Sequence, residues 1–312
     1  MKCPRKGDYM NRQNDLVKRI NNNYSKFSKG QKLLANYIID HYEKAVFLTA
    51  ARLGKIVGVS ESTVVRFANE LGYDGYPKLQ RALEELVKTK LTSIQRVEVT
   101  TDRIDQSHVL RSVLQSDADK IKYTLEEIEE AVFDQAVDMI LEAKTIYIIG
   151  VRSSATLANF LGFYFNLVFD NVKLIHTNSV SEMFEQIYRL RDDDVVIGIS
   201  FPRYSKRTLK AMEFAKTRNA SVITITDSLL SPMIQFADCS LIARSDMASF
   251  VDSLVAPLSL INALIVALCI KKKDVVVEAL GSLEQIWTEY QVYDNDDDLN
   301  IGYNLNLKSD KI

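Results

Sequence analysis

The chain has 312 residues, of which 47% are hydrophobic and 26% are charged, a composition typical of folded proteins long enough to contain two domains. It excludes a chain that is disordered throughout. The formal net charge of −2 conceals a strong asymmetry, because residues 1–96 contain 18 Lys and Arg against 9 Asp and Glu, whereas the remainder has a net charge of −11. The basic N-terminal part therefore indicates a polyanionic partner.

The sequence argues against a secreted, metal-binding or membrane-spanning protein. The N-terminus lacks the apolar core of a signal peptide, and the three cysteines and three histidines lack metal-ligand spacing. The apolar segment Phe250–Ile270 is interrupted by Asp252, Pro257 and Asn262, which are costly in lipid, so we expect a buried helix there. We therefore expect a cytoplasmic protein with no metal, no bound cofactor and no membrane partner.

The basic part begins with a polar segment and a first helix. Residues 1–15 are polar, and we expect them to be disordered. Apolar residues at helical spacing then predict a leading helix over Ser28–Tyr42, which packs against the segment that follows. Its apolar face contains Leu33, Leu34, Tyr37, Ile38 and Tyr42.

Two short amphipathic helices follow between Leu48 and Leu83. Apolar residues recur there at helical spacing, stop at a Gly-Val-Ser turn, and then repeat. Gly58 supplies the backbone freedom that ends the first helix, Ser60 is a good N-cap for the second, and Gly54 is small enough for the helices to approach closely. This pattern predicts a helix-turn-helix.

The outward face of the second helix has residue types that read DNA. Arginine suits guanine edges, asparagine suits adenine, and hydroxyl groups suit phosphates or bases. A turn-rich step after this helix provides a tyrosine and a lysine that can lie along the DNA backbone. We therefore expect double-stranded DNA to contact Ser60, Ser62, Thr63, Arg66, Asn69, Tyr76 and Lys78. The alternative is a helical subdomain that binds an acidic protein.

A linker separates the basic part from the rest of the chain. A last helix from Pro77 to about Lys90 completes an expected helix-turn-helix domain at residues 16–91. Thr92–Thr101 has neither a helical period nor a strong apolar run, so we expect the linker at residues 92–105. A second domain is predicted at residues 106–283, starting with a helix from about Val109 to Leu125, and an acidic, Asn-rich extension at residues 284–312.

Apolar, β-branched runs alternate with helical patterns in the second domain. Continuous apolar strands separated by helices predict a parallel sheet that is covered by helices on both faces. The expected fold is thus an all-α helix-turn-helix domain followed by a three-layer α/β domain with a parallel β-sheet. The five expected strands are Thr145–Ile149, Val172–Ile175, Val195–Ser200, Ser221–Thr226 and Ser240–Ala243.

Hydroxyl groups and two arginines follow the carboxyl ends of these strands, where parallel sheets bind ligands. Hydroxyl and N–H groups at a helix N-terminus bind anions, and an arginine adds charge for a phosphate. The sequence therefore predicts a site for a phosphorylated polyol at Ser153, Ser154, Ser200, Arg203, Ser205 and Asp227. Each hydroxyl taken alone is also explained by helix N-capping.

Together these residues resemble the RpiR/MurR family of bacterial transcription regulators, over about Leu16 to Lys272. The stretch VSESTVVRFANELGYDGYPKLQ at residues 59–80 is similar to the recognition-helix signature of that family. Gly150 and Ser154 match its Gly-x-x-x-Ser loop, and residues 200–205 fall on its Ser-x-Ser-Gly-x-Thr phosphate loop, where Pro202 and Arg203 replace the Ser-Gly pair. The resemblance implies a helix-turn-helix domain joined to a sugar-isomerase (SIS) domain that binds a phosphosugar effector.

Two functions remain open. The first is a DNA-binding transcription regulator, not an enzyme, whose SIS domain senses a phosphosugar and alters operator binding in a homodimer or homotetramer. The second is a sugar-phosphate isomerase with an appended basic domain. The resemblance implies that isomerases of this fold carry a Glu ahead of a Ser-Thr-Lys element, whereas this chain reads SDMASFVDSLV, with Asp246, Asp252 and Ser253. That difference favours the regulator.

Overall fold

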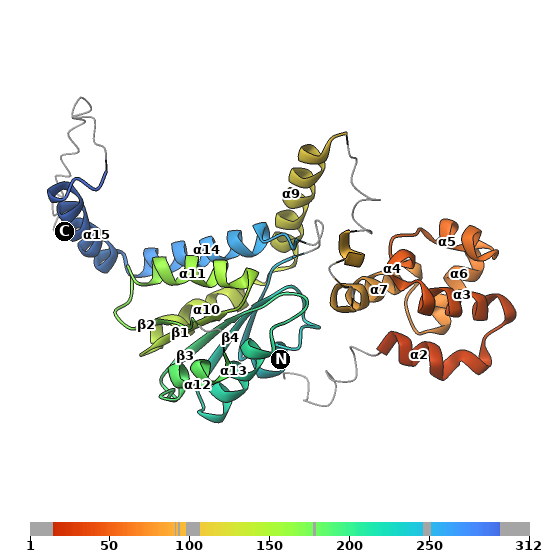
Figure 1. The fold of residues 1–312 in the computed structure, drawn as a ribbon, viewed down its shortest axis with the longest axis horizontal. Helices are drawn as coiled ribbons and strands as arrows, with labels where there is room; N and C mark the ends of the chain where they lie inside the picture. Colours follow the sequence, from red (N-terminus) through yellow and green to blue (C-terminus); the bar gives the residue numbers. More distant parts are fainter. Residues whose placement is uncertain are drawn as a thin grey trace, which may run out of the picture.

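The structure, a computed structural model, describes residues 15–90, 92, 94–97, 107–176, 179–245 and 251–293. A helical domain at the N-terminal end precedes an α/β domain (Figure 1). Residues 1–14 of the segment 1–15 that was expected to be disordered, and residues 294–312 of the acidic extension, lie outside the described residues, whereas Asp15 is helical.

The helical domain is built around one apolar core. Residues such as Leu34, Leu53, Phe67 and Leu79 are fully buried in it, and each comes from a different helix. The helix predicted from Pro77 to Lys90 is confirmed as α7. The elements in order are α2 (Asp15–Asn23), η1 (Tyr24–Lys26), α3 (Lys29–Asp40), α4 (Tyr42–Ala45), α5 (Ala50–Val57), α6 (Glu61–Glu70) and α7 (Tyr76–Lys90).

The leading helix differs from its prediction in its buried face. Ser28 begins α3 with a reciprocal capping box to Gln31, as a good N-cap does. The buried residues of α3 are Leu34, Ala35 and Ile38, whereas Leu33 is exposed, so its assignment to the apolar face was wrong. The physical reason is helical periodicity: Leu34 and Ile38, four residues apart, define the side of α3 that faces the core, and Leu33 is turned away from that side by about 100°.

The predicted linker contains a helical turn. Residues 94–97 are helical, and Thr92 and Gln95 cap this turn reciprocally, since Thr92 N donates to Gln95 Oε1 at 3.0 Å and Gln95 N donates to Thr92 Oγ1 at 3.3 Å. Arg96 in this turn is buried and its Nη1 donates to Asp252 Oδ1 of the α/β domain at 2.7 Å. The predicted linker therefore includes a short helical turn that contacts the α/β domain.

A five-stranded, all-parallel sheet forms the centre of the α/β domain, as predicted. Its strand order is β2-β1-β3-β4-β5, and central strands β1 and β3 are buried along their whole length. β-branched residues dominate these strands, which suits a pleated surface that is packed on both faces. The strands are β1 (Ile146–Gly150), β2 (Val172–Leu174), β3 (Val195–Ile199), β4 (Ser221–Thr226) and β5 (Cys239–Ile242).

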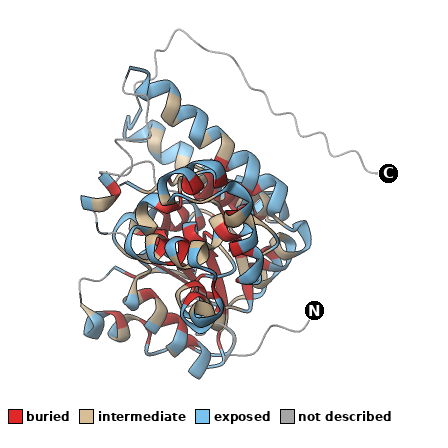
Figure 2. Cartoon of the chain, turned by 90° about the vertical axis from the view of Figure 1, so that its right-hand side faces the viewer, coloured by how far each residue is buried: buried red, intermediate tan, exposed pale blue. Residues whose placement is uncertain are grey.

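Helices cover both faces of the sheet, which confirms the three-layer architecture. Ile148 and Ile197 face the layer formed by α10, α11 and α14, whereas Tyr147 and Val196 face α12 and α13. Figure 2 shows the buried residues gathered between these layers. The helices are α9 (Val109–Glu127), α10 (Glu130–Glu142), α11 (Ser153–Phe165), α12 (Val180–Ile187), α13 (Lys206–Thr217), α14 (Val255–Lys271) and α15 (Lys273–Glu289), with the short η2 (Ile234–Phe236) before β5.

Helices α14 and α15 test the prediction of a buried apolar helix and overlap the start of the predicted acidic extension. The apolar segment predicted to form a buried helix contains most of α14, which buries one face against the sheet. Within the described residues, no one helix is both long and apolar enough to cross a membrane, and only α14 and α15 together, bent by 98°, have the length and composition. Helix α15 continues through residue 284, where the acidic extension was predicted to begin.

Candidate nucleic-acid interface and anion site

The turn between α5 and α6 has the geometry of a helix-turn-helix. Gly58 ends α5 in the left-handed conformation, with a φ of 80°, and Ser60 caps α6 by accepting a hydrogen bond from Thr63 N. A Cβ on Gly54 would lie 2.7 Å from the carbonyl oxygen of Val59, so only glycine allows the turn to pass this close to α5. The predicted roles of these three residues are confirmed.

Helix α6 separates a core face from an outward face. Its buried residues are Val64, Phe67 and Ala68, whereas Ser62, Arg66 and Asn69 are exposed. Arg66 lies back along its own helix, with Nε 3.3 Å from the carbonyl oxygen of Ser62. The hydroxyl of Ser60 is 2.9 Å from that of Ser62 and 2.8 Å from that of Thr63, so the three hydroxyls form one cluster at the helix N-terminus.

Asn69 lies near the C-terminal end of α6, and Lys78 follows in α7. The Asn69 Oδ1 accepts a hydrogen bond from Gly75 N at 3.0 Å, and this bond holds the turn between α6 and α7. Lys78 is exposed in the first turn of α7. A surface of hydroxyls, a guanidinium, an amide and an ammonium therefore faces outward, and these groups can donate to phosphates and base edges.

Tyr76 does not belong to this surface. It is 4% exposed, and its hydroxyl donates to the carbonyl oxygen of Leu48 at 2.7 Å. Burial raises the pKa of Tyr76 to about 12. The prediction that Tyr76 lies along the DNA backbone is wrong, because its ring continues the apolar stripe of α7 with Leu79 and Leu83. That spacing of three and seven residues is the signal in the sequence that indicates a core position.

The loops after β1 and β3 lie at the point where the strand order reverses. Strand β1 has β2 on one side and β3 on the other, and in open parallel sheets this switch point is where ligands bind. Gly150 ends β1, and a Cβ there would lie 2.4 Å from the carbonyl oxygen of Ser154. The Gly-x-x-x-Ser spacing therefore lets the first turn of α11 fold back against the strand end.

The loop after β3 directs backbone N–H groups toward hydroxyl oxygens. Ser200 Oγ accepts a hydrogen bond from Ser205 N at 3.0 Å. Ser205 caps α13, and its Oγ accepts from Arg207 N at 3.2 Å and from Thr208 N at 3.4 Å. N–H groups at a helix N-terminus are the donors that bind phosphate, so the serine hydroxyls here occupy positions that an anion's oxygens can take.

Both switch-point loops hold an arginine in a conformation that side chains rarely adopt. The φ angles are 61° for Arg152 and 65° for Arg203, and both residues are exposed. Such strained positions concentrate at functional sites because the surrounding structure must hold them. An exposed arginine thus lies in the loop between each of these strands and the helix that follows it.

Asp227 is fully buried after β4, and its role differs from the predicted one. Its Oδ1 accepts hydrogen bonds from the Tyr204 hydroxyl at 2.8 Å and from Thr226 Oγ1 at 3.4 Å. The prediction that Asp227 contacts a ligand is wrong for this conformation, because no part of its surface is exposed. Its carboxylate ties the loop after β3 to β4. Tyr204, which the sequence analysis did not single out, completes this tie.

The remaining candidates differ in how accessible they are. Ser153 and Arg203 are exposed and Ser205 is half-buried, whereas Ser154 and Ser200 are 4% and 3% exposed. Among the residues that the structure describes, no group of three His, Cys, Asp or Glu side chains is placed to hold a metal ion. The predicted residues follow the carboxyl ends of three neighbouring strands, β1, β3 and β4, and most of them lie in the two loops after β1 and β3.

A helix-turn-helix with a polar outward face, followed by a parallel α/β domain with hydroxyl groups and arginines at its strand ends, defines the class of helix-turn-helix proteins that carry a second, α/β domain. Comparison with known families agrees. Residues 14–90 match the helix-turn-helix domain of the rpiR family, and residues 139–267 match the SIS domain. The chain therefore belongs to the RpiR family of transcription regulators, which carry both domains.

Two curated relatives are consistent with this assignment, and one solved structure has a similar fold. An HTH-type transcriptional regulator of Clostridium perfringens, CPE0189, is 25% identical over 228 residues, which are 72% of this chain and 80% of the relative. One from Haemophilus influenzae is 26% identical over 75% of this chain and 81% of its own. The fold is similar to that of the Vibrio vulnificus NanR protein complexed with ManNAc-6P, with a TM-score of 0.57, 20% identity, and 90% of this chain and 100% of NanR covered.

Proposed function

We propose that this transcription regulator binds operator DNA through the outward face of α6, and that a phosphosugar bound at the switch-point loops changes that binding. The observation that carries the proposal is the pairing of two strained arginines with two helix N-termini at adjacent strand ends. Phosphate needs that combination of N–H donors and positive charge. The NanR protein, which has a similar fold, was solved with a sugar phosphate.

The DNA-binding residues of the proposal are all members of the predicted set except the buried Tyr76, and Asn69 is one of them. Ser60, Ser62, Thr63 and Arg66 surround the first two turns of α6, the part of a recognition helix that contacts base edges. Lys78 adds a positive charge beyond the helix, which suits a phosphate.

Ligand sensing is favoured over isomerisation by the environment of Asp252. An aldose–ketose isomerase needs a carboxylate base that can reach a carbon acid. Asp252 is instead bound to the guanidinium of Arg96, and its neighbour Ser253 donates to Asp117 Oδ1 of α9 at 2.6 Å. These contacts assign Asp252 a structural role, so we propose that the protein is not an enzyme.

The same contacts provide a route between the two domains. Arg96 belongs to the predicted linker, Asp117 to the first helix of the α/β domain, and Asp252 to the segment between β5 and α14. That segment starts at the carboxyl edge of the sheet, where the ligand is proposed to bind. A ligand that shifts this edge changes the position of the linker and, in a homodimer or homotetramer, the spacing of two DNA-binding domains.

A thermal-shift measurement on the full chain with a panel of phosphosugars tests the ligand site. A ligand that binds only the folded state stabilises it by about 2.7 kcal/mol at 100 times its Kd, so at least one phosphosugar is expected to raise the melting temperature. Ser200→Ala, which removes the hydroxyl that accepts from Ser205 N, is expected to reduce this shift.

The matched control is Ser282→Ala, whose hydroxyl donates to a carbonyl oxygen on the exposed surface of α15. It is expected to keep the full shift. A panel in which no phosphosugar stabilises the protein, or an equal shift in Ser200→Ala, contradicts the proposed site.

A further inference from the structure

Two neighbouring helices of the α/β domain begin with positive charge and without a carboxylate. Arg152 is the N-cap of α11, and Arg203, Lys206 and Arg207 lie at or just before the start of α13, while neither helix has an acidic residue in its first turn. The helix dipole already makes an N-terminus positive, so cations there destabilise the helix. Helices α6, α12 and α15, by contrast, each have a carboxylate in the first turn. The stability of α11 and α13 therefore does not explain these cations.

The starts of α11 and α13 follow neighbouring strands. Strands β1 and β3 are hydrogen-bonded in parallel register, with Gly150 opposite Ile199, so the loops that follow them leave the same edge of the sheet. Neighbouring strands are about 4.8 Å apart, a spacing that the carbon chain of a sugar bridges. One molecule can therefore place an anionic group at each loop.

The two helix starts differ in how their backbone N–H groups are satisfied. Ser205 caps α13, because its Oγ accepts from Arg207 N and Thr208 N. Arg152 makes no capping hydrogen bond with its side chain at the start of α11, and no carboxylate within the described chain forms an ion pair with it or with Lys206. Uncapped N–H groups beside a guanidinium suit an anion. The start of α11 is thus a second place for negative charge, separate from the start of α13.

A buried hydroxyl marks the first turn of α13 as incomplete. Thr208 is fully buried, and its Oγ1 has no hydrogen-bond partner among the residues that the structure describes. Buried polar groups are nearly always hydrogen-bonded, so an unpaired donor at this position indicates a turn that a ligand or an ordered water completes. This observation is independent of the charges.

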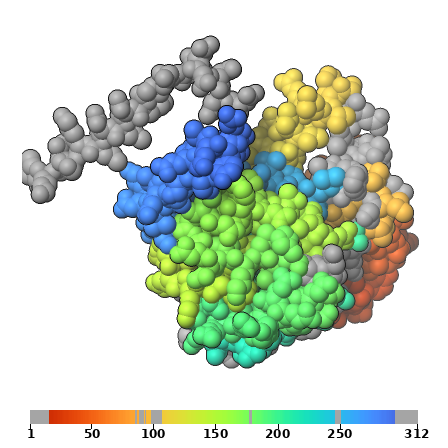
Figure 3. Space-filling model, turned by 60° about the vertical axis from the view of Figure 1, so that its left-hand side comes forward, coloured from red at the N-terminus to blue at the C-terminus, as the bar shows by residue number. Residues whose placement is uncertain are grey.

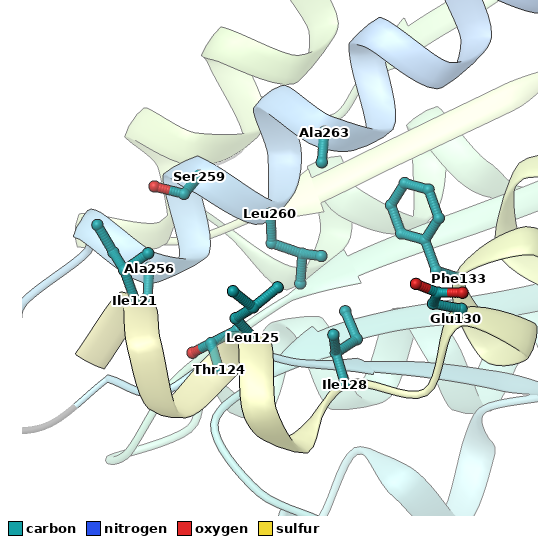
Figure 4. A pocket seen from close by; sticks show the side chains of 10 residues that line it. All are labelled: Ile121, Thr124, Leu125, Ile128, Glu130, Phe133, Ala256, Ser259, Leu260 and Ala263. Atoms are coloured by element: carbon teal, nitrogen blue, oxygen red, sulfur yellow. The ribbon is translucent and has the colours of Figure 1, made fainter. Parts of the chain in front are cut away.

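A cavity elsewhere in the α/β domain does not suit an anion. It has a volume of about 250 Å³, lies between α9, α10 and α14, and is lined mostly by apolar side chains, such as Leu125, Phe133 and Leu260 (Figure 4). Its one charged lining residue, Glu130, repels a negative group. The cavity lies beside α9, the yellow helix at the top of Figure 3, whereas α12 and α13 lie in the lower part of that view. A second anionic group therefore belongs at the loops after β1 and β3.

We propose that the effector is a phosphosugar with a second anionic group, either a carboxylate or another phosphate. Its phosphate lies at the start of α13, and its second anionic group lies at Arg152. A phosphate monoester has a charge of about −1.5 to −2 at pH 7, which the N–H groups and cations at α13 can balance. The guanidinium of Arg152 then binds the further negative charge. This inference rests on the proposed function, because it takes the effector to be a phosphosugar bound at these loops.

Calorimetric titration of the full chain with matched ligands tests the proposal. Each set contains an aldose 6-phosphate, the phosphorylated aldonic acid of the same stereochemistry, and the corresponding bisphosphate. The tightest ligand is expected to have a second anionic group and a Kd at least about tenfold lower than that of its single-anion counterpart, as a charge-assisted contact supplies. Comparison of the acid with the bisphosphate shows whether that group is a carboxylate or a phosphate.

The outcomes separate this inference from the proposed function. If an aldose 6-phosphate binds tightest, or if the members of each set bind equally, the second anionic group is wrong and phosphosugar sensing stands. If no phosphosugar of any kind binds, both proposals fail.

Variants of Arg152 test its role. Arg152→Gly removes the guanidinium and suits the φ of 61°, so it is expected to fold. It is expected to reduce the preference for the second anionic group to about twofold or less, while the affinity for the single-anion counterpart stays within about threefold. Arg152→Lys, which keeps the charge, is expected to retain part of the preference.

The control is Arg218→Ala, which removes an exposed positive charge at the far end of α13. It is expected to keep the full preference for a second anionic group. An unchanged preference in Arg152→Gly, or an equal loss in Arg218→Ala, overturns the assignment of Arg152.

Discussion

Arg66 and Tyr76 are only ten positions apart in the sequence, but one side chain is exposed and the other is buried. Tyr76 donates to the carbonyl oxygen of Leu48 inside the core, whereas Arg66 is exposed on the outward face of α6. One therefore contributes to stability and the other to recognition. The two residues provide a matched pair of variants that separate these effects.

Arg66→Ala is expected to lower the preference for operator over random DNA by about 1–3 kcal/mol, the amount that one base contact from arginine supplies. The melting temperature of the protein is expected to stay unchanged. Tyr76→Phe is expected to lower the free energy of unfolding by about 1 kcal/mol, because the carbonyl of Leu48 loses a buried donor, and to leave DNA preference intact.

Fluorescence anisotropy with specific and random DNA, together with calorimetric unfolding, measures both quantities. A loss of the preference for operator DNA in Tyr76→Phe would show that Tyr76 contacts DNA after all. An unchanged preference for operator over random DNA in Arg66→Ala would contradict the proposal that α6 is the recognition helix.

Buried polar residues mark the limit of what the sequence predicts at this scale. The spacing of polar and apolar types indicates which elements form, but it does not indicate which polar side chain finds a partner inside the fold. Tyr76 and Asp227 were both assigned to the surface because their types suit DNA and sugars. In the structure each is enclosed, and the Tyr76 hydroxyl donates to the Leu48 carbonyl oxygen whereas Asp227 Oδ1 accepts from the hydroxyls of Tyr204 and Thr226.

At the scale of elements, periodicity was a reliable guide where it was strong. The five strands were each predicted to within one residue at either end, because continuous β-branched runs between helical patterns have few alternatives. The prediction failed where a short segment gains its structure from a distant contact. The turn at residues 94–97 is polar, and its Arg96 finds a partner more than 150 positions away.

Replacing a glycine within a helix by alanine is expected to have opposite effects on stability at two positions. Gly54 lies in α5 with the Val59 carbonyl oxygen 2.7 Å from where a Cβ would be, whereas Gly281 lies in α15 with nothing within 4 Å. Gly54→Ala is therefore expected to lower the free energy of unfolding by about 1–3 kcal/mol through backbone displacement. Gly281→Ala is expected to raise it by about 0.5–1 kcal/mol, because alanine is the better helix former.

Calorimetry of the two variants beside the unaltered chain measures these changes. A Gly54→Ala protein that is as stable as the original would show that the turn relaxes without cost. It would then contradict the close approach of the turn to α5.

At the scale of the whole molecule, the Arg96–Asp252 ion pair joins the linker to the α/β domain. The guanidinium is buried and the carboxylate is mostly buried. Removing one partner of such a pair leaves the other charge buried and unpaired, so the linker is expected to detach from the α/β domain. Arg96→Ala is expected to leave DNA affinity in the absence of ligand within a few-fold of the original. It is expected to reduce the change that a phosphosugar produces, because the linker no longer follows the α/β domain.

Asp252→Asn weakens the same contact from the other side and is expected to have a similar effect. Lys216→Ala is the control, because it removes an ion pair with Asp238 that is exposed and lies within the α/β domain. A full phosphosugar response in both Arg96→Ala and Asp252→Asn would exclude this contact as the route.

We propose that one chain couples a DNA-reading surface on α6 to a phosphate-binding rim on the sheet. The most direct test is the affinity of the full chain for DNA selected from a random-sequence pool, measured with and without a saturating amount of the phosphosugar that stabilises it most. We expect the phosphosugar to change the affinity for DNA by about 5–150-fold, and we expect DNA to change the affinity for the phosphosugar by the same factor. An unchanged DNA affinity at saturating phosphosugar would contradict it.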